Sequence, residues 1–124
     1  MGQPSLLNSD TIKRIEDSIM SLANLTQTIG SDESELYLFS IFIEAGSGAV
    51  TMLHESSEVF SFNTFNETHF KIGSSVFDLI ILDVNLVLDG EMFSDSESWL
   101  DSSCFYFRYT NNKNESLFFR FDLL

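Results

Sequence analysis

The sequence predicts an α+β fold in which an N-terminal helix packs on a mainly antiparallel β-sheet. An apolar stripe near the N-terminus repeats at helical spacing, whereas later apolar runs are short, rich in Phe and β-branched residues, and bounded by turn residues. Thirteen Phe against one Pro and six Gly favour regular elements around an aromatic core. At 124 residues, the chain 1–124 is expected to form a single domain.

The predicted N-terminal helix starts near Ser9 or Asp10, either of which can cap it, and ends before Gly30. The next run, 35–44, is aromatic and β-branched and predicts a strand that is partly buried on both faces. A turn at 45–48 and a return over 49–54 complete a hairpin. Two short strands are predicted to follow, one around Phe60 and Phe62 and one around Phe70 and Ile72.

The segment 76–88 is ambiguous because its β-branched content suits a strand, while its polar residues fall on one side at helical spacing. We favour a second helix there and keep the strand as the alternative. Residues 91–101 are polar and acidic and predict a loop. A terminal hairpin is predicted over 104–110 and 116–123, where aromatic residues alternate.

The charge is strongly unbalanced, with 19 acids against six bases and a net charge of −13. Such a field repels phosphate backbones and anionic lipids, so direct binding to nucleic acid or to a membrane is not expected. It attracts basic proteins and speeds their encounter. The alternative interpretation is that the acidity serves solubility alone.

Catalytic chemistry is not indicated, and we expect no enzyme. Neither a phosphate-binding glycine loop nor a nucleophile-elbow serine occurs. Cys104, the single cysteine, would need His54 or His69 as its base, but its place in an aromatic strand predicts a buried, inert thiol.

No metal or cofactor site is predicted either. Asp95, Glu97 and Asp101 are spaced loosely like a calcium loop, but the mid-loop Gly and the terminal Glu are missing. Residues 1–7 show no signal peptide, and 76–88 is too short and too charged to span a bilayer. The expected location is the cytoplasm.

Two acidic patches are the candidate partner-binding sites. The first surrounds Trp99, and an aromatic anchor among charged residues is typical of interface hot spots. In the alternative interpretation, Trp99 packs into the core. The second patch precedes the first strand. The candidate residues are Asp89, Glu91, Asp95, Glu97, Trp99 and Asp101 in the first patch, and Asp32 and Glu33 in the second.

The segments Glu97-Ser98-Trp99, Cys104 to Tyr109 and Phe118 to Asp122, together with the order of elements, resemble bacterial immunity proteins. These are the cytoplasmic antitoxins of contact-dependent growth inhibition and other polymorphic toxin systems. The resemblance implies one-to-one binding of a toxin domain, often a nuclease with a basic cleft, which an acidic inhibitor complements in charge.

The leading hypothesis is therefore an immunity protein that occludes the active site of a basic, nuclease-type toxin domain. One alternative is a phage-encoded nucleic-acid mimic that inhibits a host nuclease or DNA-binding protein, whose carboxylates would be spaced like phosphates along one face. Another is an enzyme or small-molecule module, which requires a deep pocket with converging polar groups. The oligomeric state is left open.

Overall fold

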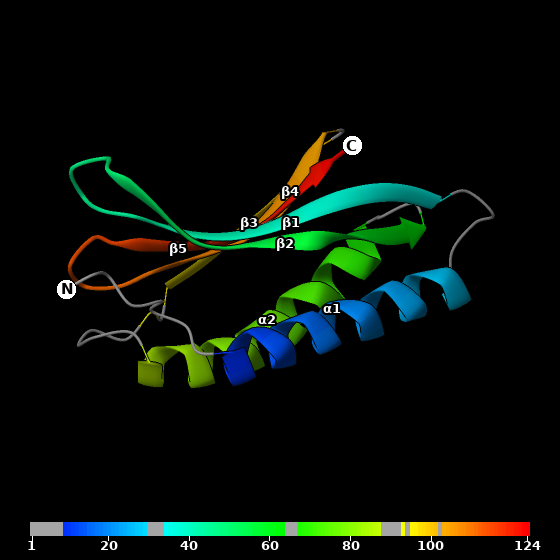
Figure 1. Cartoon of the computed structure of the whole chain (residues 1–124), viewed down its shortest axis with the longest axis horizontal. Coiled ribbons are helices and arrows are strands. Elements are labelled where there is room, and N and C mark those ends of the chain that lie inside the picture. The colour runs from blue at the N-terminus through cyan, green and yellow to red at the C-terminus, as the bar shows by residue number, and fades with distance from the viewer. Residues whose placement is uncertain (1–8, 30–33, 64–66, 88–92, 94, 102) are drawn as a thin grey trace.

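The computed structural model describes residues 9–29, 34–63, 67–87, 93, 95–101 and 103–124, with only the backbone described for 26–29, 69 and 82–87. It is an α+β fold of two layers, a five-stranded antiparallel sheet and two helices that cover one of its faces (Figure 1). The elements in chain order are α1 (Ser9–Ile29), β1 (Ser34–Glu44), β2 (Val50–Asn63), α2 (Glu67–Val87), β3 (Asp95–Leu100), β4 (Cys104–Thr110) and β5 (Ser116–Leu123).

The strand order across the sheet is β2-β1-β5-β4-β3. The last strand in the chain, β5, is therefore the central one, and it joins the β1–β2 hairpin to the β3–β4 hairpin. The edge strands are β2 and β3. In β1, β4 and β5 the side chains alternate between the helix-covered face and the opposite face, which we call the open face.

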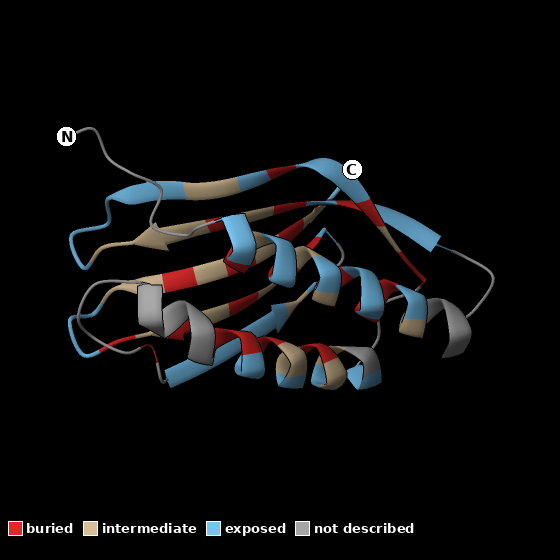
Figure 2. Cartoon of the chain, turned by 60° about the horizontal axis from the view of Figure 1, so that its bottom comes forward, coloured by how far each residue is buried: buried red, intermediate tan, exposed pale blue. Residues whose placement is uncertain are grey.

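Phenylalanine builds the core between the sheet and the helices. On β4 and β5 the rings of Phe105 and Phe121 stack with centroids 4.4 Å apart, and Phe77 of α2 stacks on Phe107 at 4.7 Å. Figure 2 shows that the buried residues of the helices lie on the side that faces the sheet. Full burial of one such side chain contributes about 1.5–3 kcal/mol to folding. Among the described residues, the buried Phe are Phe39, Phe60, Phe62, Phe77, Phe93, Phe105, Phe107, Phe119 and Phe121.

The helix α1 follows the predicted stripe, since Ile15 and Ile19 are fully buried and Leu22 is 2% exposed. At the middle of α2, Gly73 permits close packing. A Cβ there would lie 3.0 Å from Cζ of Phe107 and 3.3 Å from Cδ2 of Leu22. Neither of the two described helices combines the length and the hydropathy needed to cross a membrane.

Several sequence predictions are confirmed and others are wrong. The helix at 76–88 is confirmed to Val87, but it begins at Glu67, so the strand predicted around Phe70 and Ile72 is wrong. The strands predicted at 49–54 and around Phe60 are a single long strand, β2, whose pairing with β1 shifts register twice. Residues 95–100 of the predicted acidic loop form the edge strand β3. The terminal hairpin is confirmed as β4 and β5.

Candidate partner-binding surface

The candidate residues of the first acidic patch that the structure describes lie on β3 and directly after it. Every second position of β3 is a candidate residue: Asp95, Glu97 and Trp99. Their partners in β4 are Thr110, Arg108 and Tyr106, respectively. These three side chains therefore belong to the open face, at one edge of the sheet. The candidates Asp89, Glu91, Asp32 and Glu33 lie outside the described residues.

Trp99 is not a core residue, because 52% of it is exposed. Its indole Nε1–H donates a hydrogen bond of 3.1 Å to Oδ2 of Asp101. The ring is thus held in one orientation at the edge of the open face while much of its surface stays in water. An exposed, oriented Trp is the kind of side chain that anchors protein interfaces.

Asp101 stabilises the turn between β3 and β4. Its Oδ1 accepts hydrogen bonds from the backbone N–H of Ser103 at 2.7 Å and of Cys104 at 2.9 Å. These two bonds, together with the bond from Trp99, lower the pKa of Asp101 to about 2. Its carboxylate is therefore already engaged within the chain, and we assign Asp101 a positioning role for Trp99.

Glu97 is also engaged, since its carboxylate forms an ion pair with Arg108 of β4 and accepts a 3.4 Å hydrogen bond from the Tyr106 hydroxyl. The carboxylate of Asp95 forms no hydrogen bond or ion pair with the other described residues, and Asp95 is exposed. Of the acids predicted on this segment and described by the structure, Asp95 is therefore the one whose charge is most available to a partner.

A strip of apolar side chains, which the sequence did not predict, crosses the open face. Phe42 of β1 and Phe118 of β5 stack with centroids 4.6 Å apart, and Tyr106 of β4 meets Phe118 edge-on at 5.5 Å. Met52 of β2 pairs with Phe42, and Trp99 of β3 pairs with Tyr106. We call these five side chains, one from each strand, the open-face strip. The signal for it was the near-continuous apolar run of β1, which is typical of a strand with two apolar faces.

Charged residues lie on both sides of the open-face strip. On one side are Asp95 and Glu44, and on the other are Glu55 and Asp122. The two arginines of this face are paired with carboxylates, Arg108 with Glu97 and Arg120 with Asp122 at 2.8 Å. Together with Glu97 and Asp101, these acids outnumber the two bases on the described part of the open face, so its net charge is negative.

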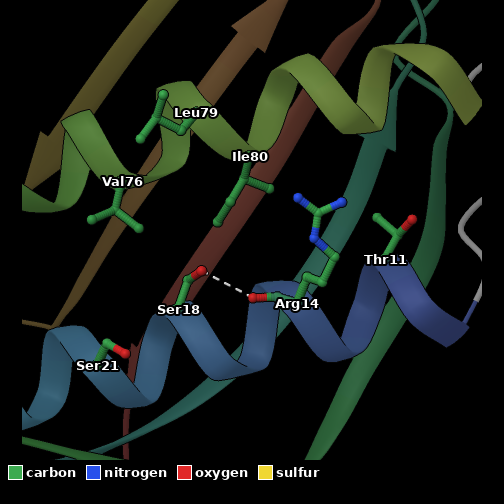
Figure 3. Close-up of a pocket in the computed structure, with 7 residues that line it drawn as sticks. All are labelled: Thr11, Arg14, Ser18, Ser21, Val76, Leu79 and Ile80. Atoms are coloured by element: carbon green, nitrogen blue, oxygen red, sulfur yellow. Dashed lines mark hydrogen bonds between the residues drawn. The ribbon is translucent and has the colours of Figure 1, made fainter.

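A groove of about 330 Å³ runs between the two helices on the other side of the molecule (Figure 3). Its α2 wall is apolar and its α1 wall is polar, and the Ser18 hydroxyl there donates to the carbonyl of Arg14. No cysteine or histidine is among the described residues that line it. The lining residues are Thr11, Arg14, Ser18, Ser21, Val76, Leu79 and Ile80.

Cys104 and His54, which were considered for catalysis, lie on the non-adjacent strands β4 and β2. Cys104 lies on β4 with 8% of its surface exposed, and burial raises the pKa of its thiol. His54 lies on edge strand β2, where its Nε2 is 3.3 Å from Oε2 of Glu16 on α1. The His69 side chain lies outside the described set. Within the part of the chain that the structure describes, no three His, Cys, Asp or Glu side chains gather to hold a metal ion.

Comparison of the chain with protein-family models, with curated proteins and with solved structures gave no match. The fold and the surface themselves define a two-layer α+β protein whose sheet presents an apolar, acid-flanked face.

Proposed function

We propose that this chain is an immunity protein, which binds a basic, nuclease-type toxin domain one to one in the cytoplasm and occludes its active site. The observation that carries the proposal is the exposed Trp99 at a sheet edge shared with Asp95, on a chain of net charge −13. Charge would steer a cationic cleft to such a surface, and the indole of Trp99 would hold the cleft there once the complex buries it.

The distribution of charge on the open face favours this function over a nucleic-acid mimic. A mimic needs a run of carboxylates spaced like phosphates. On the described part of the open face, Arg108 and Arg120 lie among the acids, and apolar rings separate the acids on the two sides. A mixture of apolar and charged groups is typical of a protein–protein interface.

The direct test is neutralisation of a toxin domain encoded beside this chain, purified and titrated with it. We expect toxicity to be lost at a one-to-one ratio and the association rate to fall steeply as salt is added. If no neighbouring product binds, or if the association rate does not depend on ionic strength, the proposal is wrong.

Two matched pairs of variants locate the contact. Asp95→Lys and Asp17→Lys change the net charge equally, but Asp17 is exposed on α1. Only Asp95→Lys should slow association, by about tenfold. Trp99→Ala should speed dissociation by about 30-fold, as a hot-spot truncation of ~2 kcal/mol does, whereas Leu79→Ala on the exposed side of α2 should not. Equal effects within either pair would remove β3 from the interface.

A further inference from the structure

The open face of the sheet carries contiguous apolar side chains, and the described chain does not cover them. Both helices lie on the opposite face (Figure 1). Besides Trp99 and Met52, which are 52% and 53% exposed, the open face carries the cross-strand pair Leu38 and Val59 at 40% and 44%. Met52 and Trp99 are the two ends of the open-face strip, and its half-buried members Phe42, Phe118 and Tyr106 connect them. Contiguous apolar side chains of this kind mark an interaction site, whereas single ones do not.

We infer that the open-face strip is the docking site for a basic amphipathic helix of the partner. The inference deepens the proposed function and rests on it for the identity of the protein that carries this helix. The occupant is defined by chemistry: an apolar stripe that meets the strip, with Lys or Arg on both of its flanks.

The dimensions of the strip fit a helix laid across the strands. The strip runs from β3 through β4, β5 and β1 to β2, and strands lie about 4.8 Å apart, so its length is about 19 Å. At 1.5 Å per residue this corresponds to about 13 residues of helix. A helix packed on a sheet face is the ordinary way to cover it, and it would complete a three-layer sandwich.

The charges select a cationic helix. Asp95 and Glu44 lie on one side of the strip, and Glu55 and Asp122 on the other, so Lys or Arg on each flank of the helix would meet a carboxylate. A second copy of this chain would bring the same surplus of acids against them. Like charges placed together oppose association, so the open face is poorly suited to self-pairing.

The strip is also ordered before any partner arrives. The Phe42–Phe118 stack is nearly parallel at 10°, the guanidinium of Arg108 lies 5.8 Å from the Phe118 ring, and Asp101 fixes the Trp99 indole. Side chains held in this way lose little further freedom on binding, which favours affinity.

The test uses a synthetic amphipathic helix of Leu and Lys, about 14 residues long, and the same pattern with Glu in place of Lys. Binding is measured by calorimetry and mapped by amide chemical shifts. We expect the Lys peptide to bind, with the shift changes centred on β1, β4 and β5, and the Glu peptide not to bind. Changes centred on α1 and α2, or equal binding of both peptides, would overturn the inference.

Two methionines provide a matched control. Met52 belongs to the strip and Met20 lies on α1, and the two are 53% and 47% exposed, so neither substitution should disturb the core. Met52→Lys should weaken peptide binding about tenfold. The variant loses an apolar side chain that the bound peptide would bury, and it adds a positive charge that repels the lysines of the peptide. Met20→Lys should change it by less than about twofold. Equal losses would show that the peptide binds through net charge alone.

The two proposals fail separately. If the peptide misses the open face while a neighbouring toxin is neutralised, the helix-docking inference is wrong and the immunity function stands. If the peptide docks on the strip but no toxin is neutralised, the docking site stands and the partner belongs to another class.

Discussion

Gly73 offers a sharp test of the packing between α2 and the sheet, because two opposing effects act at one position. In the middle of a helix, Gly→Ala normally stabilises by about 1 kcal/mol. Here the new Cβ would lie 3.0 Å from Cζ of Phe107 and 3.3 Å from Cδ2 of Leu22. The Phe107 ring packs between two other rings, since its centroid lies 4.7 Å from that of Phe77 and 5.2 Å from that of Phe70. It therefore has little space to move away from a new Cβ.

Overpacking of a filled core costs about 1–3 kcal/mol. This cost exceeds the gain in helix propensity, so Gly73→Ala should lower the free energy of unfolding by about 1 kcal/mol. The corresponding fall in Tm is about 4 °C. Urea unfolding followed by circular dichroism measures it. The control is Ser75→Ala, on an exposed position of the same helix, which should be neutral or slightly stabilising. A Gly73→Ala variant more stable than the parent would refute the close packing described here.

The other predictions concern titration. All three tyrosines have raised pKa values, and burial is the main cause. It raises the pKa of Tyr37 to about 12 and also raises the pKa of Tyr106 and of Tyr109. The Tyr109 hydroxyl donates a hydrogen bond of 2.8 Å to Asp78. At pH 10, where an unfolded chain is half ionised, the folded protein should therefore show little phenolate absorbance, and stability should fall as pH rises from 10 toward 12; half-ionisation at pH 10 in the native state would contradict this. The pKa of Asp101 is lowered from 3.8 to about 2, so its stabilising effect should be complete above pH 3.8 and lost as pH falls toward 2. Asp101→Asn should weaken that acid dependence in thermal melts and alter the fluorescence of Trp99, the only tryptophan; an unchanged spectrum would show that Asp101 does not orient the indole.

The parts of the fold that the sequence predicts are those in which local pattern and tertiary contact agree. The alternation of Phe105, Phe107 and Tyr109 places every second side chain against the helices, as expected for a half-buried strand. The start of α2 was missed because Gly73 interrupts its apolar stripe. Gly73 faces Phe107, which leaves little space for a larger side chain. Hydropathy alone does not reveal this steric requirement.

The edge strands were mispredicted for a different reason. The acidic, Ser-rich β3 has little strand propensity of its own, and its conformation comes from pairing with β4, where Glu97 finds Arg108. In β2, the polar residues 55–58 separated the two predicted strands, but Ser56 is buried and its hydroxyl donates to Glu16 of α1 at 3.2 Å. The first contact lies within one hairpin, and the second joins residues 40 positions apart in the chain.

For the candidate site, Asp95, Glu97 and Asp101 do lie near Trp99, but the sequence did not predict the groups that these carboxylates contact within the chain. The carboxylates of Asp101 and Glu97 are already used within the chain, by the turn after β3 and by Arg108. The stack of Phe42 on Phe118 joins strands separated by more than 70 residues. Only the sheet order brings these rings together.

The central place of β5 bears on how the chain reaches this state. The β1–β2 and β3–β4 hairpins can each form early, but they share no neighbour until the last strand in chain order inserts between them. During synthesis the sheet must therefore wait for residues 116–123, and until then the backbone edges of β1 and β4 that pair with β5 lie open to other chains. Such late, long-range closure predicts slow folding and a need for protection from aggregation while the gap is unfilled.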